Sequence, residues 1–141
     1  MINERRKVAA ISWGVIMLAL WMPSATLAAA EDIHIRSVAE DRTLDCNNQS
    51  DAVISGSSNN VTVRNCRSVT ITGASNDIDI FGTPMVRVSG ASNNVTVTFD
   101  IEGSIHVSGG SNDVDVIEKQ GSKTRVHDRG LRNNISRGVA E

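Results

Sequence analysis

The chain has 141 residues, which is enough for one small domain. Of these residues 40% are hydrophobic, and the formal net charge is −2. This charge argues against general binding to nucleic acid, a property that depends on an excess of Lys and Arg. Aromatic residues make up only 3% of the chain, so a large sugar-binding cleft with aromatic walls is excluded.

The first 30 residues have the layout of a secretory signal peptide. Charged residues at 4–7 precede a mostly apolar run at 8–21, and a stretch of small residues ends with Ala28, Ala29 and Ala30. The apolar run is shorter than the ~20 residues that a membrane-spanning helix needs. We therefore expect cleavage after Ala30 or Ala28, export to the periplasm or the extracellular space, and no membrane span in the processed chain.

A short motif, in which Gly is followed three residues later by Asn, recurs five times. Its glycines are Gly56, Gly73, Gly90, Gly109 and Gly130, and its asparagines are Asn59, Asn76, Asn93, Asn112 and Asn133. The asparagines are therefore 17, 17, 19 and 21 residues apart, a spacing typical of repeat architectures. We expect the Gly to serve a corner that needs positive φ or a close backbone approach. The Asn is expected to bond backbone groups in the turn, or its neighbour in the adjacent copy.

Apolar and polar residues alternate on both sides of each Asn in the first four copies. The positions seven and five residues before the Asn, and two and four after it, are Val or Ile everywhere except at Ala52. Strict alternation with β-branched residues predicts strands with one buried face. Each repeat should therefore contain two short strands.

Two all-β folds satisfy this pattern. One is a parallel β-solenoid, in which each repeat is a full coil and equivalent residues stack about 4.8 Å apart. The other is an antiparallel β meander or sandwich, in which the polar Ser-Asn segments are hairpin turns. We favour the solenoid, with about five right-handed coils, because only stacking lets identical Asn residues form a ladder.

Residues 31–141 are then predicted to form a single domain, with a net charge of −4 because residues 1–30 hold three basic residues and one acidic residue. We expect an N-terminal cap at 31–51, four regular coils at 52–116, and a degenerate coil with a basic tail at 117–141. Solenoid ends expose strand edges that need caps, and such edges also permit end-to-end self-association.

Cys46 and Cys66 are the two cysteines of the chain. In an exported protein an even number of cysteines predicts a disulfide. The two residues are 20 positions apart, close to one repeat length, so a solenoid can place one above the other.

The Gly-x-x-Asn-x-Val motif, the early cysteine pair, the signal peptide and the β-repeats together resemble a family of secreted bacterial proteins catalogued as domain of unknown function 3060. The resemblance covers about residues 44–116. It implies an exported bacterial β-repeat protein, and the family has no catalytic motif to carry over.

Calcium is the strongest chemical alternative, since Asp77 and Asp79 recur as Asp113 and Asp115 and resemble the aspartates of calcium-binding β-rolls. These acidic copies alternate with neutral ones, so their carboxylates should lie two coils apart, roughly 9–10 Å. Six to eight oxygens must converge on one Ca²⁺, which makes these aspartates weak candidates.

An enzyme is a further alternative, in the form of a carbohydrate-active β-helix. His34, His106 and His127 have no metal-ligand spacing, and no carboxylate pair is expected in a pocket. We therefore predict a structural or binding module of the bacterial envelope without a cofactor, whose partner is an envelope protein or a glycan.

Export and processing can be tested directly. Mass spectrometry of the exported protein should show a chain that begins at Glu31 or Ala29, because the small residues before them fit a signal-peptidase site. An intact Met1 on exported protein would contradict the prediction.

Overall fold

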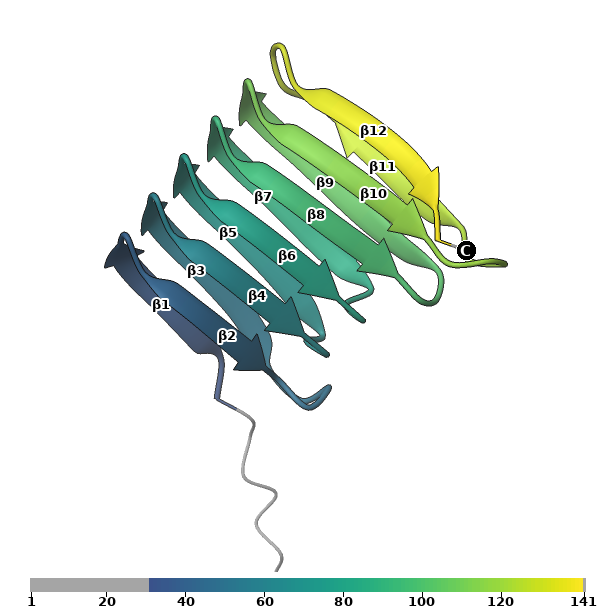
Figure 1. Ribbon diagram of the computed structural model, residues 1–141, viewed down its shortest axis with the longest axis horizontal. Helices are drawn as coiled ribbons and strands as arrows, with labels where there is room; N and C mark the ends of the chain where they lie inside the picture. The colour runs from purple at the N-terminus through teal and green to yellow at the C-terminus, as the bar shows by residue number, and fades with distance from the viewer. Residues whose placement is uncertain (1–30, 141) are drawn as a thin grey trace, which may run out of the picture.

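The computed structural model describes residues 31–140, so the predicted signal peptide lies outside the described residues. This part of the chain consists of twelve strands in two six-stranded sheets (Figure 1). Sheet A contains β1 (Ile33–Val38), β3 (Asp51–Ser57), β5 (Ser68–Ala74), β7 (Met85–Ala91), β9 (Gly103–Gly110) and β11 (Thr124–Asp128). Sheet B contains β2 (Asp41–Asp45), β4 (Asn60–Arg64), β6 (Asp77–Phe81), β8 (Asn94–Phe99), β10 (Asp113–Glu118) and β12 (Asn134–Val139). Residues 31–140 include no helix with the length and hydrophobicity needed to cross a membrane.

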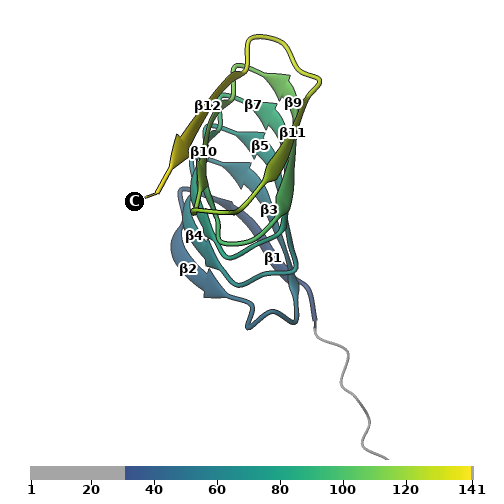
Figure 2. The same ribbon diagram turned by 90° about the vertical axis from the view of Figure 1, so that its right-hand side faces the viewer.

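Each odd-numbered strand and the even-numbered strand that follows it make one coil. The strands of successive coils pair in parallel and in register, so that Gly56 is opposite Gly73 and Gly73 is opposite Gly90. Figures 1 and 2 show the two sheets facing each other and the chain winding in the right-handed sense as it advances. The predicted β-solenoid is confirmed, and the antiparallel alternative is wrong.

The solenoid has six coils rather than about five. The segment 31–51, predicted to be a cap, contains β1 and β2 and forms the first coil. The motif does not reveal this coil because Ser37 takes the Gly position opposite Gly56. Similarly, Glu40 takes the Asn position, directly before the pair formed by Asp41 and Asn60.

The core lies between the sheets and is built almost entirely from Val and Ile. All sixteen inward positions predicted from the alternation are at most 1% exposed. They are Ala52, Ile54, Val61, Val63, Val69, Ile71, Ile78, Ile80, Val86, Val88, Val95, Val97, Ile105, Val107, Val114 and Val116. Each such Val or Ile contributes about 1.5–3 kcal/mol through burial, so this row of side chains supplies most of the driving force for folding.

The marker asparagines form a continuous ladder of hydrogen bonds along one corner of the solenoid. The Nδ2 group of each of the first four donates to Oδ1 of the Asn in the next coil, over 3.0 Å from Asn59 to Asn76 and 2.9 Å from Asn76 to Asn93. The ladder continues through Asn112 to Asn133. Each acceptor Oδ1 also receives the backbone N–H of the preceding Asn, as in the 3.1 Å bond from Asn59. The predicted contact between neighbouring copies is therefore confirmed.

The close stacking at this corner explains why Gly recurs in successive coils. Gly73 has a φ of 126°, and a Cβ atom there would overlap the carbonyl oxygen of Gly56. A second strained position, which the sequence did not indicate, lies two residues after each of these glycines. Ser58, Ser75, Ser92 and Ser111 adopt φ between 55° and 58°, the left-handed region that L-residues other than Gly, Asn and Asp rarely visit.

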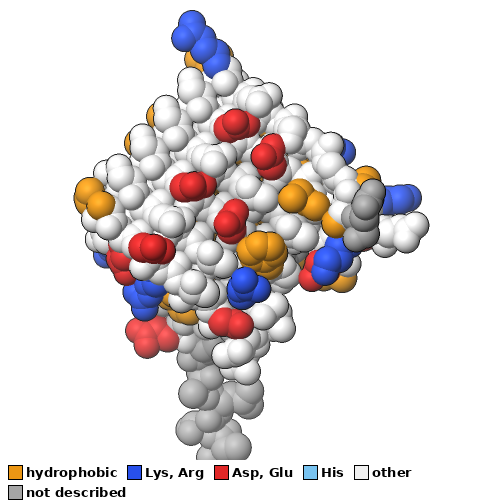
Figure 3. All heavy atoms as spheres, viewed as in Figure 1, with side chains coloured by type: hydrophobic (Ala, Val, Ile, Leu, Met, Phe, Trp, Pro, Cys, Tyr) orange, Lys and Arg blue, Asp and Glu red, His pale blue; other side chains and the backbone are white. Residues whose placement is uncertain are grey.

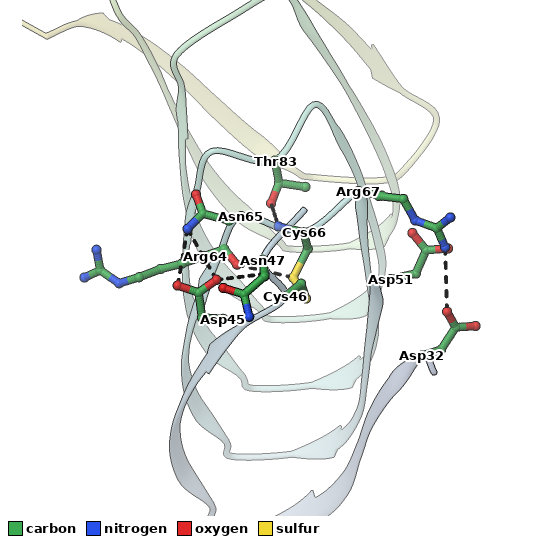
Figure 4. The surroundings of a disulfide bond; sticks show 10 residues. All are labelled: Asp32, Asp45, Cys46, Asn47, Asp51, Arg64, Asn65, Cys66, Arg67 and Thr83. Carbon is green, nitrogen blue, oxygen red and sulfur yellow. Dashed lines mark hydrogen bonds and ion pairs between the residues drawn. A yellow bond between two sulfur atoms is a disulfide. The ribbon is translucent and has the colours of Figure 1, made fainter. Parts of the chain in front are cut away.

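The predicted disulfide is present and joins the first coil to the second at the opposite corner (Figure 4). The Cα atoms of Cys46 and Cys66 lie 4.7 Å apart, the spacing of stacked coils. Both cysteines are buried, and the backbone N–H of Cys66 donates to the Oγ1 atom of Thr83 in the coil above. The disulfide and Thr83 therefore lie in one inward-facing column at this corner.

The sixth coil is polar, as the sequence predicts. Val126 and Ile135 pack against the core, whereas Asp128 and Arg137, which take the other two inward positions of the repeat, are exposed. The Asp128 carboxylate accepts hydrogen bonds from Nδ2 of Asn133 and from the backbone N–H of Gly130. These bonds, that from Asn133 above all, hold the pKa of Asp128 below its ordinary value.

The ladder can be tested with two adjacent residues of one type. Asn93→Ala removes the acceptor of two donors on Asn76 inside the protein and should lower the free energy of unfolding by about 2–4 kcal/mol. Asn94→Ala removes only an exposed bond to Asp77 and should change it by less than about 0.5 kcal/mol. Urea unfolding measures both, and equal losses would contradict a buried ladder.

The disulfide makes a separate prediction. The denatured, unreduced protein should contain no free thiol, and two thiols per chain would contradict the bond. Because the bond closes a loop with a sequence separation of 20, replacing both cysteines with Ser should lower the free energy of unfolding by about 3 kcal/mol.

Candidate functional site

Most inward and corner positions are occupied by structural residues, so the outward columns of the two sheets are the first candidates for a binding surface. A column here means the residues that occupy the same outward position in successive coils. The outward columns of sheet B carry carboxylates. One of them reads Asp41, Asn60, Asp77, Asn94, Asp113 and Asn134 from the first coil to the sixth. Figure 3 shows this face, on which the acidic side chains stand singly among neutral ones.

The alternation of Asp and Asn satisfies the carboxylates locally. Nδ2 of Asn94 donates to Asp77 and Nδ2 of Asn134 donates to Asp113, each over 2.9 Å. Asp79 and Asp115 lie in the neighbouring column with Thr96 between them. Within residues 31–140 no three acidic, His or Cys side chains converge as the ligands of a metal would. The register therefore places the four candidate calcium ligands on two coils, in β6 and β10, with the neutral Asn94 and Thr96 of β8 between the two pairs.

The outward face of sheet A carries basic and imidazole side chains on its last three strands, β7, β9 and β11. One outward column reads His34, Val53, Thr70, Arg87, His106 and His127. Its last three members lie on adjacent strands β7, β9 and β11, and the rings of His106 and His127 stack with centroids 4.8 Å apart and planes 18° from parallel. Three nitrogen-bearing side chains thus follow one another along the solenoid axis.

The next outward column of sheet A is lined with hydroxyl groups. Oγ of Ser89 donates to the carbonyl oxygen of Ile71 over 3.2 Å, and Oγ of Ser108 donates to that of Val88 over 3.3 Å. Arg129 continues this column beyond β11, where its backbone N–H donates to the Val107 carbonyl over 2.9 Å. Because each hydroxyl has used its proton, its lone pairs are available as acceptors.

These two columns border a shallow hollow of about 280 Å³. We call it the basic hollow, and it is lined by Arg87, His106, Val107, Ser108, His127 and Arg129. The strands fix the backbone of its lining residues, whereas Arg87, His127 and Arg129 reach into solvent from exposed positions. No carboxylate is among the residues that line it.

The charge of the basic hollow is not neutralised within the described part of the chain. The ion pairs between residues 31 and 140 are Arg42 with Glu40, Arg67 with Asp32 and Asp51, and Lys119 with Asp100. Arg87 and Arg129 are in none of these pairs. An unpaired guanidinium offers a planar set of donors that matches carboxylate and phosphate groups, so the hollow can bind an anion.

A second hollow, at the corner near the disulfide, is a weaker candidate. It is lined by Arg64, Asn65, Phe81, Gly82, Thr98, Asp100 and Lys119. Its cations already have partners, since the Arg64 guanidinium lies 4.9 Å from the centre of the Phe81 ring. Lys119 is 2.7 Å from Asp100.

The alternation of the repeats implies that Arg87 and His106 face outward, but it does not connect them to His127 and Arg129. The sequence predicted a degenerate coil with a basic tail for residues 117–141, and most of these residues belong to a sixth coil that stacks on the fifth. One signal was available: His127 stands six residues before Asn133, as His106 stands six before Asn112. Extending that column through the degenerate copy would have revealed the cluster.

The comparisons with known proteins agree with the resemblance seen in the sequence. Residues 54–99 match the model of a family described as protein of unknown function (DUF3060), which confirms the predicted family over that segment. The match extends from β3 to β8 and includes Cys66 and Arg87. No curated protein and no solved structure matches the chain.

Proposed function

We propose that this protein is a non-catalytic binding module of the bacterial envelope, and that the basic hollow on sheet A binds an anionic ligand. One observation carries the proposal. Four side chains from three successive coils, those of Arg87, His106, His127 and Arg129, line one hollow, and no carboxylate lines it. Arg87 and Arg129 carry a permanent positive charge, and the imidazoles of His106 and His127 add N–H donors beside them. A bound anion would accept hydrogen bonds from these groups.

The envelope location rests on two features. The N-terminal 30 residues have the pattern of a signal peptide, and the disulfide between Cys46 and Cys66 is a bond that persists in oxidising compartments. The periplasm and the bacterial cell surface are both such compartments.

Shape and rigidity support binding rather than catalysis. General acid–base catalysis needs a positioned donor or acceptor within hydrogen-bond reach of a reacting group that is held in place. Three of the side chains that line the basic hollow, those of Arg87, His127 and Arg129, project from exposed positions. Because the strands carry the side chains, little backbone entropy is lost when a ligand binds, which suits recognition of a ligand that arrives ready-made.

The test is to titrate the exported protein with a compact anion, tripolyphosphate, and to measure binding by NMR. Signals of Arg87, His106 and His127 should shift together, and raising the NaCl concentration should weaken the binding because salt screens exposed charges. Arg87→Gln combined with Arg129→Gln should reduce the affinity about tenfold or more, since two charge-assisted bonds are lost.

A matched control lies in the same two columns at the other end of sheet A. His34 and Arg36 occupy the first coil, so His34→Gln combined with Arg36→Gln removes similar side chains far from the hollow. This double variant should bind as the unmodified protein does. Equal loss in both double variants, or no saturable shift at all, would overturn the proposed function.

A further inference from the structure

We propose that the ligand of the basic hollow is an acidic polysaccharide whose chain lies along the solenoid axis, across strands β7, β9 and β11. The inference rests on the proposed function, and it goes further by naming the ligand class and its direction.

The nitrogen-bearing side chains of the basic hollow are regularly spaced along the solenoid axis. Arg87, His106 and His127 are paired in register on adjacent strands, so they repeat at the inter-strand spacing of about 4.8 Å. A single compact anion would be surrounded from several sides, whereas these groups form a line. A line of evenly spaced donors fits a polymer that carries one anion on each successive unit of similar length, as an extended chain of uronic acids does.

A column of hydroxyl groups lies beside that line. Ser89 and Ser108 donate to backbone carbonyls and can therefore only accept further hydrogen bonds from a ligand. A sugar acid carries both a carboxylate for the column of Arg87, His106 and His127 and hydroxyl donors for the Ser column. A phosphodiester would supply the anion but no donor for these acceptors.

Both columns continue beyond the basic hollow. Towards the N-terminus the two columns continue as Thr70 and Thr72 on β5, which are neutral and partly exposed. Thr72 likewise donates its proton to a carbonyl, that of Ile54. No carboxylate interrupts these columns between β5 and β11. A polymer can therefore extend past the basic hollow without meeting a like charge or a wall.

The basic hollow also lacks the features that other polyanions need. Single-stranded nucleic acids bind through aromatic stacking platforms, and the two Phe residues of the chain, Phe81 and Phe99, lie in sheet B. Anionic membrane surfaces are bound by basic residues together with buried apolar side chains, and the hollow is lined by one apolar residue, Val107.

The experiment compares galacturonic acid as monomer, trimer and hexamer with the same hexamer after methyl esterification, which removes its charge. Affinity should rise about tenfold or more from monomer to hexamer, because successive units bind with a high effective concentration. The esterified hexamer should not bind. Arg87→Gln should weaken hexamer binding more than Arg36→Gln does. Arg36 is the control because it lies in the same column as the hydroxyl groups but in the first coil, far from the basic hollow.

The direction of the chain has its own readout. On going from trimer to hexamer, the NMR shifts should spread to Thr70 and Thr72 on β5, which lie further along the axis. Spreading instead along β7, to Met85 and Ala91 at its two ends, would mean that the ligand follows the strand and would overturn the inference.

Other outcomes separate the two proposals. If poly-glutamate or inositol hexakisphosphate of comparable charge bound as tightly as the hexamer, the polysaccharide inference would fail and the anion-binding function would stand. If tripolyphosphate bound and no uronate oligomer did, the result would be the same. If no anion bound, both proposals would fail together.

Discussion

The buried amide ladder is the interaction on which the rest of this structure depends. Asn59, Asn76, Asn93 and Asn112 are each about 1% exposed, and a buried amide without partners costs more than its hydrogen bond contributes. Slipping one coil against the next by a residue would remove the partners of two amides and turn the adjacent Val and Ile side chains outward. Hydrophobic burial supplies the free energy of this fold, and the ladder selects its register.

The ladder also has a direction, which sets different chemical requirements at its two ends. Each Nδ2 group points to the following coil, so the last one, on Asn133, needs an acceptor, and the Asp128 carboxylate supplies it. At the other end Oδ1 of Asn59 needs donors, and it receives the hydroxyl of Ser37 and the backbone N–H of Glu40. Each terminal coil therefore departs from the repeat for a physical reason: the first replaces the motif with Ser37 and Glu40, and the sixth keeps Asn133 but adds Asp128 as its acceptor. Charged side chains near the open edges also disfavour further strand addition.

The features that could be predicted from the sequence are those that stacking forces to recur. The inward Val and Ile positions, the Gly column, the parallel solenoid and the disulfide follow from period-two alternation and from a spacing close to one coil. The first coil could not be predicted, because Ser37 and Glu40 replace the motif. The left-handed Ser75 and its equivalents could not either, since Ser is common in ordinary turns. The basic hollow was missed because the copies grow to 19 and 21 residues, which hides the register that aligns His106 with His127.

Separation of roles between columns explains how such a thin protein can carry an unneutralised basic surface. Inward and corner positions are fixed by packing and by the ladder, whereas the outward positions face solvent and are free to carry charge. The carboxylates of Asp77, Asp79, Asp113 and Asp115 lie on sheet B, with the whole core between them and Arg87. Neighbouring neutral residues on their own sheet satisfy several of them. The ladder that holds the coils in register also fixes the spacing of Arg87, His106 and His127, so the same hydrogen bonds that determine the fold determine which repeating anion can match the surface.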